Sequence, residues 1–437
     1  MAQEGVAIKA CSILSEAQSL AVAQPDRPSG YDWLRPEAVP MFEMPAMVLA
    51  KPEGRSLCFI SSGTTWTAEI KEGKSLISDN DALDLDTLQP ATWFEFSDYW
   101  NYAYNGIYSP QSVWDPASEQ EWIYAIMHVE NKNRHNAETG ERFENTILAR
   151  RQYRFPEEYE GLVNGRYIFP FWTYFGFVTA SVSPVEQRFR TGFMQNQLGP
   201  VIWPSMGYLD PSGRALQHAH PHPTTIVHDG YLYVYYIEDA YTDPAMCMLE
   251  PGRERGVKVA RCPLSKLMKP GFFRTYYMGK FSEPSLPTRF SKENRRFLFE
   301  KGGRSSVIHP DLSCDHVRHD ETGESGFSSR IVRFSVARLR GTRYFLSVEQ
   351  RWEEGNVGGI ALRVSTDLLN WSTKTRVPGV DGWKLRYPVF ANSDYTRNYE
   401  IDAHEFYVAG GGFSTTSIVK LAVEISESQK QRIPGPT

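Results

Sequence analysis

The 437-residue sequence lacks both a long apolar run and a surplus of basic residues. No stretch approaches the roughly 18 apolar residues that a membrane-spanning helix needs, so we expect no membrane span. The chain carries 47 Lys and Arg against 52 Asp and Glu, which leaves a net charge of −5. Because nucleic-acid binders neutralise phosphates with a basic surface, this balance argues against a nucleic-acid partner.

Cysteine is scarce, with five widely spaced residues and no Cys-x-x-Cys pair. An odd number at such spacing argues against a disulfide framework and against a structural zinc knuckle. The N-terminus lacks the pattern of an intact secretory signal, since Lys9 and Glu16 interrupt the apolar segment 6–23. We expect a secreted or periplasmic protein if a signal has been removed, and a cytoplasmic protein otherwise.

Several catalytic motifs are missing as well. The sequence contains no Gly-x-Ser-x-Gly elbow, no Gly-rich nucleotide loop followed by Lys and Ser or Thr, and no His-Glu-x-x-His motif. These absences count against the hydrolases, nucleotide-binding enzymes and zinc peptidases that use them. Helical periodicity is weak nearly everywhere, and the best candidate is a short N-terminal helix over residues 9–23.

Aromatic residues, glycine and proline are plentiful instead. The chain has 11 Trp, 23 Tyr, 24 Phe, 33 Gly and 28 Pro. This composition is typical of short strands joined by turns. Aromatic-rich β proteins often bind sugars, because flat rings stack on the apolar faces of pyranoses; the alternative for any single ring is ordinary strand core.

One layout recurs five times along the chain: an apolar strand, a polar or Gly-containing turn, a second apolar strand, and then a third. The five repeats span residues 46–70, 112–181, 224–261, 331–365 and 387–423. Sheets that recur with uneven insertions are typical of a propeller, in which radial repetition protects the strand edges.

We therefore expect an all-β fold, a five-bladed β-propeller with long inter-strand insertions and a short N-terminal helical segment. The propeller would cover residues 40–428, between an N-terminal extension over 1–39 and a C-terminal tail over 429–437. A β-sandwich or two separate β domains is the alternative.

Three glutamates end the second strand of successive repeats, namely Glu130, Glu238 and Glu349. In a blade that meanders outward, the start of the first strand and the end of the second lie on the same face near the axis. The three carboxylates would thus surround one funnel. Glycoside hydrolysis uses two carboxyl groups, about 5–5.5 Å apart for retention and roughly 6.5–9.5 Å apart for inversion. We expect the catalytic residues among these glutamates and His128, which would share Glu130's side of the strand. The alternative is that each glutamate caps a strand or holds loop backbone.

A run of histidines stands at the start of the third repeat's inner strand. His218, His220 and His222 alternate, so they would point to one side of an extended strand. They would contact substrate or carry protons, and a metal site or a structural role are the alternatives. Because no second shell for a metal is evident, we expect no cofactor, with a metal ion at this cluster as the remaining possibility.

Other candidates for substrate contact lie at the predicted mouth of the funnel. They are Trp172, Tyr174, Asp239 and Arg330, together with Tyr108 before the second repeat. Arg330 opens the fourth inner strand, where a guanidinium would receive a carboxylate or sulfate of a sugar in a bidentate manner. Each of these residues also has a core or surface interpretation.

The turn 364–371, with the sequence VSTDLLNW, resembles the Ser-x-Asp-x-x-x-Trp turn of five-bladed propeller glycosidases, chiefly families 43 and 32. Residues 229–236 and 256–262 are similar to the matching strands of those enzymes. By layout the resemblance covers most of residues 40–425. It implies a propeller fold and the cleavage of glycosidic bonds.

The catalytic motifs of those families are not matched. Residues 109–112 read SPQS where family 43 enzymes begin an inner strand with Asp-Pro-Ser, and the Asn-Asp-Pro motif of family 32 is absent. No catalytic residue is therefore carried over. We expect a glycoside hydrolase acting on a poly- or oligosaccharide by carboxylate acid/base catalysis. The alternatives are a non-catalytic carbohydrate-binding propeller and a glycoside phosphorylase, which would need clustered cations to hold phosphate.

Overall fold

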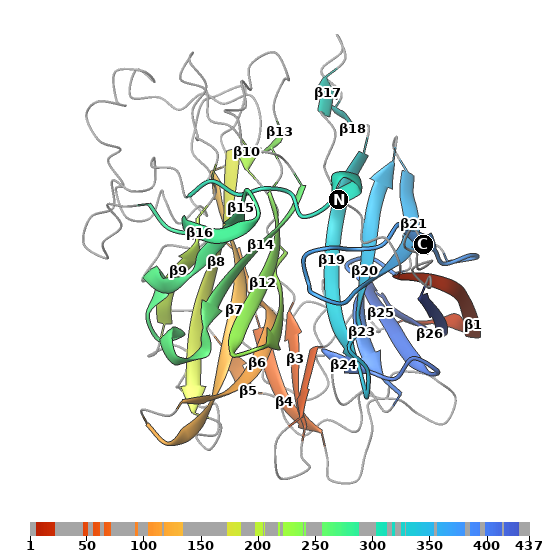
Figure 1. Ribbon diagram of the computed structural model, residues 1–437, viewed down its shortest axis with the longest axis horizontal. Coiled ribbons are helices and arrows are strands. Elements are labelled where there is room, and N and C mark those ends of the chain that lie inside the picture. The colour runs from red at the N-terminus through yellow and green to blue at the C-terminus, as the bar shows by residue number, and fades with distance from the viewer. Residues whose placement is uncertain are drawn as a thin grey trace, which may run out of the picture.

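The computed structural model of the chain consists almost wholly of β-strands (Figure 1). It describes residues 6–21, 47–50, 56–61, 65–70, 92–94, 104–115, 118–133, 173–184, 197–203, 205, 217–218, 222–238, 240–241, 256–287, 303–312, 317–319, 325–327, 329–353, 356–380, 385–393, 398–412 and 415–427. Within these residues there is no α-helix, and no helix is long and apolar enough to cross a membrane. The helical turns described are η4 (Leu264–Lys266), η5 (Pro270–Phe272) and η7 (Pro310–Leu312).

Five sheets of four or more strands follow one another along the described chain. The first sheet contains β2 (Met47–Ala50), β3 (Ser56–Ser61), β4 (Thr65–Ile70) and β5 (Thr92–Phe94). The second contains β6 (Tyr104–Asp115), β7 (Gln120–Asn133), β8 (Thr173–Pro184), β9 (Gln197–Ile202), β10 (Gln217–His218) and β13 (Ala240–Tyr241). The third contains β11 (Thr224–His228), β12 (Tyr231–Glu238), β14 (Gly256–Pro263), β15 (Arg274–Tyr277) and β16 (Lys280–Pro284).

The last two sheets complete the series. The fourth contains β19 (Ser329–Leu339), β20 (Phe345–Glu353), β21 (Asn356–Ser365), β22 (Thr375–Arg376) and β24 (Glu400–Ile401). The fifth contains β23 (Val389–Asn392), β25 (Phe406–Gly412), β26 (Thr415–Glu427) and β1 (Val6–Ala21), and a separate pair joins β17 (Val317–His319) to β18 (Ser325–Phe327). All five predicted strand triplets are therefore present, each as antiparallel neighbours.

The predicted N-terminal helix is wrong. The segment forms β1, which pairs antiparallel with β26 from Val6 opposite Glu427 to Ala21 opposite Thr415. Figure 1 shows β1 in red beside the blue strands of the fifth sheet. Ile8 is buried there, so pairing with the chain's last strand overrides the weak helical period of the segment. The boundaries of the extension and the tail stay predictions.

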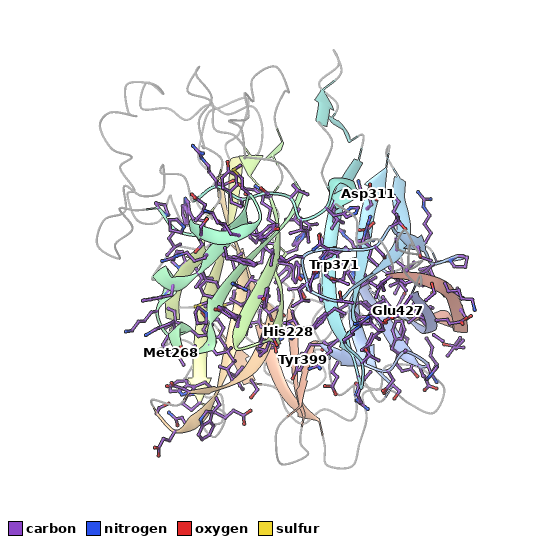
Figure 2. The ribbon with its side chains drawn as sticks, viewed as in Figure 1. His228, Met268, Asp311, Trp371, Tyr399 and Glu427 are labelled. Atoms are coloured by element: carbon purple, nitrogen blue, oxygen red, sulfur yellow. The ribbon has the colours of Figure 1, made fainter. Side chains whose placement is uncertain are left out.

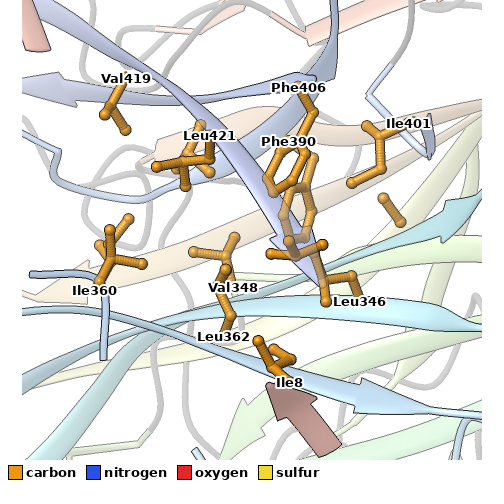
Figure 3. Packing of buried hydrophobic residues seen from close by; sticks show 14 of the residues in the cluster. Ile8, Leu346, Val348, Ile360, Leu362, Phe390, Ile401, Phe406, Val419 and Leu421 are labelled. Carbon is orange, nitrogen blue, oxygen red and sulfur yellow. The ribbon is translucent and has the colours of Figure 1, made fainter. Parts of the chain in front are cut away.

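Side chains that point alternately to the two faces of each sheet fill the spaces between neighbouring sheets. On β12, Leu232, Val234 and Tyr236 pack toward the second sheet, whereas the odd-numbered residues between them pack toward the fourth. A third cluster joins the fourth and fifth sheets, where Ile8 lies beside Leu362 (Figure 3). Burial of these apolar side chains at about 25 cal/mol per Å² is the main force that holds the sheets face to face.

The turn 364–371, whose sequence resembles a turn of propeller glycosidases, forms a contact between two sheets. Ser365 Oγ accepts the backbone N–H of Asp367 at 3.2 Å, and the Asp367 carboxylate accepts two further backbone N–H groups. This turn places Trp371 between the third and fourth sheets (Figure 2), edge-on to Phe334 at 5.3 Å. Tyr235 of β12 donates its hydroxyl to the Leu368 carbonyl at 2.6 Å. The motif therefore docks one sheet on the next.

The first strands of the five sheets lie next to one another in chain order. β2 contacts β6, β6 contacts β11, β11 contacts β19, and β19 contacts β23. Ser109 of β6 and Thr225 of β11 share a hydrogen bond of 2.6 Å between their hydroxyls. These inner strands bring residues from sequence-distant repeats to one place.

Candidate functional site

Five buried side chains meet near the starts of the inner strands of four successive sheets. They are Tyr108 on β6, His128 on β7, His222 just before β11, Arg333 on β19 and Tyr387 just before β23. We call these residues the inner-strand cluster. We expected the start of a sheet's first strand and the end of its second strand to lie on the same face. Tyr108 and His128 agree with this expectation, because their rings lie 5.1 Å apart.

The His222 ring is at the centre of the inner-strand cluster. It stacks on Tyr108 with centroids 5.6 Å apart and planes at 6°. It is tilted against His128 at 5.1 Å and meets Tyr387 edge-on at 4.9 Å. These distances are those of favourable ring pairs. Two imidazoles thus sit among flat ring faces in the interior of the protein.

Arg333, on β19, ties the cluster to the backbone of β6 and of the segment just before β11. Its guanidinium donates to the carbonyl oxygens of His222 at 3.0 Å, Pro223 at 3.1 Å and Tyr108 at 3.3 Å, and to Ser335 Oγ at 2.9 Å. It also lies over the Tyr108 ring at 5.4 Å. Burial lowers the pKa of Arg333 to about 10, so the group remains a cation at neutral pH.

Two residues of the cluster have a left-handed backbone. The φ angles are 28° at His222 and 55° at Tyr387, a region that costs about 1–3 kcal/mol for a non-glycine residue. Arg333 holds the His222 carbonyl, and the Gln350 side-chain oxygen accepts the Tyr387 N–H at 2.9 Å. The surrounding contacts therefore impose the conformations that aim both rings inward.

Glu238 does not join the inner-strand cluster in the described contacts. Its carboxylate accepts the Lys258 ammonium at 2.8 Å and the Ser205 N–H at 2.6 Å, and both charged side chains are almost fully buried. Lys258 stands one strand farther out, on β14, and faces the second sheet. The ion pair joins two neighbouring strands of the third sheet, β12 and β14, and Ser205 bonds the same carboxylate.

Glu349 forms the equivalent ion pair in the next sheet. Its carboxylate accepts Nε of Arg363, on β21, at 3.0 Å and the Arg363 Nη2 at 3.4 Å. Both side chains are buried, and Arg363 also contacts Asp311 at 3.5 Å. In both sheets the cation lies opposite the residue two positions before the glutamate, on the neighbouring strand. Both cations therefore reach their glutamate in the same way.

The remaining predicted site residues lie partly or wholly outside the described residues. The backbone of Glu130, in β7, pairs with Tyr104 and Gly176. The backbones of Tyr174 on β8, His218 on β10 and Arg330 on β19 are placed. The side chains of those four residues, and all of Trp172, His220 and Asp239, are outside the described part of the chain. Of the predicted histidine run, His222 is the member whose side chain is described, and it lies in the cluster.

The described residues include no group of three or more His, Cys, Asp or Glu side chains that could hold a metal ion. His128 and His222 are close, but their described neighbours in the cluster are tyrosine rings and Arg333. Whether the histidine run holds a metal stays a prediction.

Sequence reasoning missed Arg333, Tyr387 and Gln350. A signal for Arg333 was present, since it is a lone basic residue inside the apolar strand 331–336. A charged residue at a position that should be buried is informative because burial of an unpaired charge is costly. Lys258 and Arg363 carry the same signal within apolar third strands.

Comparison with known proteins finds no matching family model and no matching curated protein. Among solved structures, the chain is similar to the catalytic domain of a GH62 α-L-arabinofuranosidase from Coprinopsis cinerea, with 9% identity over 89% of this chain and 91% of that one and a TM-score of 0.36. It is similar to an endo-arabinase from Bacteroides thetaiotaomicron, with 8% identity over 90% and 96% and a TM-score of 0.36. An α-L-arabinofuranosidase from Lactobacillus brevis matches at 9% identity over 86% and 89%, with a TM-score of 0.34.

By name, these three structures are two α-L-arabinofuranosidases and an endo-arabinase. Identities this low leave the chemistry to be argued from the chain's own side chains.

Proposed function

We propose that this chain is a glycoside hydrolase that cleaves a poly- or oligosaccharide at the inner-strand cluster of a five-bladed β-propeller. The observation that carries the proposal is the convergence of two histidines, two tyrosines and an arginine from four successive sheets. Ligand sites combine apolar and aromatic walls with a few fixed polar groups, and this cluster has that composition.

Glu130 is the carboxyl group to which we assign catalysis, because it follows His128 by two residues on β7. In hydrolysis the acid gives its proton to the glycosidic oxygen as the bond to the anomeric carbon breaks. A base takes a proton from the water whose oxygen bonds to that carbon. We assign the acid to Glu130 and the base to His128, and the proton returns to Glu130 through solvent. A positioned acid or base of this kind contributes about 10²–10⁴-fold to the rate.

Glu238 and Glu349 have a different role in this proposal. Each carboxylate is bonded to a buried cation on the neighbouring strand of its own sheet, so these residues stabilise the sheets and do not contact substrate. The role of general acid therefore falls to Glu130 among the three predicted glutamates.

The test is the release of reducing ends from a panel of plant, fungal and bacterial polysaccharides by the wild type and three variants. We expect Glu130→Gln to lower turnover at least 100-fold while its unfolding midpoint changes little. Glu238→Gln and Glu349→Gln should retain turnover per folded molecule and lose stability. Full activity of Glu130→Gln would reject the assignment, and so would loss of turnover without loss of stability in either of the other two variants.

A second candidate function is sugar binding without catalysis. It is favoured by the fact that two of the three predicted catalytic glutamates are held in ion pairs. Titration calorimetry separates the two functions. An oligosaccharide that binds to the wild type, binds more weakly to His222→Ala and is not cleaved within days would identify a binding protein. Turnover of the bound sugar supports the hydrolase.

A further inference from the structure

The described part of the chain contains three fully buried cations on inner or middle strands, and only two have an acidic partner. Lys258 pairs with Glu238, and Arg363 pairs with Glu349. Arg333, with no exposed surface, bonds to three carbonyl oxygens and one hydroxyl, all of them uncharged. The protein thus neutralises its buried cations between the sheets and leaves the cation at the inner strands without a carboxylate among the described residues.

An uncompensated buried charge is costly, because the interior replaces the hydration of the ion poorly. Carbonyl dipoles hold the guanidinium in place but do not cancel its charge. Its pKa of about 10 means that it does not escape the cost by losing its proton at neutral pH. A negative group arriving nearby would offset that cost, and the low local dielectric would strengthen the attraction.

A second arginine contacts the cluster at Tyr387. Arg386 Nη2 donates to the Tyr387 hydroxyl at 3.0 Å, and its guanidinium lies over the Tyr387 ring at 4.8 Å. The Tyr108 ring lies against Arg333 in the same way. The two tyrosines are therefore each backed by a cation, and both rings contact His222. An arginine thus contacts each of the two tyrosine rings.

We propose that the inner-strand cluster binds an anionic sugar, with the negative group of the ligand compensating Arg333. This inference rests on the proposed carbohydrate function of the cluster. The negative group is the carboxylate of a uronic acid or a phosphate, since both present oxygens to a cationic site. Neutral sugars would lack this electrostatic gain.

The experiment measures binding to the full chain by titration calorimetry, with probes that differ in charge. The probes are α-1,4-linked trigalacturonate, the neutral α-1,4-linked galactotriose, and inorganic phosphate. We expect trigalacturonate or phosphate to bind at least tenfold more tightly than galactotriose, and the one that binds identifies the source of the anion. Equal or tighter binding of galactotriose, or no preference for either anion, would overturn the inference.

Variants show which arginine causes the preference for the anionic probe. Arg333→Met should abolish the preference for the anion, whereas Arg333→Lys should retain part of it because the charge remains. If Arg333→Met does not fold, Arg386→Met serves instead, since Arg386 is only partly buried, and it should lower the preference about threefold. Arg343→Met, at an exposed arginine that pairs with Glu427, is the matched control and should leave the preference unchanged. A preference unchanged in Arg333→Met, or in Arg386→Met where that variant serves, would overturn the inference.

The inference and the proposed function fail in different ways. Turnover of a neutral polysaccharide that depends on Glu130, with no preference for anions, would reject the anionic ligand and keep the hydrolase. Anion binding that depends on Arg333, with no turnover of any polysaccharide, would keep the anionic ligand and reject the hydrolase.

Discussion

Replacing Lys258 by Met should destabilise the protein far more than the loss of a surface charge would. The Lys258 ammonium is fully buried, 2.8 Å from Glu238 Oε2 and 3.3 Å from Ser205 Oγ. Methionine keeps most of the length of the side chain and removes the charge. The Glu238 carboxylate would then be left buried with Ser205 as its remaining described partner. Breaking a buried ion pair in this way costs about 3–5 kcal/mol.

The assay is urea unfolding followed by circular dichroism, with the free energy taken from the midpoint and slope. Lys9→Met is the control, because Lys9 pairs with Glu424 at 2.7 Å with both side chains more than half exposed. Such a surface pair contributes about 0–1 kcal/mol. The double variant Lys258→Met/Glu238→Gln should recover much of the loss, since it also removes the negative charge that Lys258 balances. A cost for Lys258→Met no larger than that for Lys9→Met would refute the reasoning.

Three further predictions concern stability, measured by the same unfolding assay. Ile8→Ala should cost about 2–4 kcal/mol, because β1 carries this side chain into the core; a cost below about 0.5 kcal/mol would mean that the strand contributes little. Gly410→Ala should cost at least about 3 kcal/mol, since a Cβ there would collide with the backbone of Leu385, while Gly230→Ala, at φ 76° in open space, should cost about 1 kcal/mol. Burial, with the nearby Arg363 charge, lowers the pKa of His309 below its usual 6.5, so stability should fall as the pH drops below about 6.5, and His309→Gln should lack this loss.

The strand layout could be predicted from the sequence because it depends on local signals. Apolar alternation and the turns between strands located the three strands of every repeat, and the turn 364–371 marked a contact between sheets. The error was at residues 9–23, where a weak helical period was the local signal. Their partner is β26, about 400 residues away, and no local pattern shows that pairing.

The candidate site could be predicted only in part. The rule that joins strand starts to strand ends located His128 and His222 correctly at one place. It could not distinguish a carboxylate that faces the site from one that faces the next sheet. That distinction depends on cations on other strands, Lys258 for Glu238 and Arg363 for Glu349. A lone basic residue in an apolar strand is the sequence signal that would have identified these cations as partners of the glutamates.

The most direct test of the central claim, that carbohydrate binds at the inner-strand cluster, is hydrogen–deuterium exchange of the unmodified chain. Exchange is compared with and without an oligosaccharide that the chain binds or cleaves. Binding at the cluster should slow the exchange of amides at the starts of β6, β11, β19 and β23 and leave the outer strands β16 and β22 unchanged. Protection confined to the outer strands, or no protection of the inner strands while the sugar is bound, would show that carbohydrate binds elsewhere.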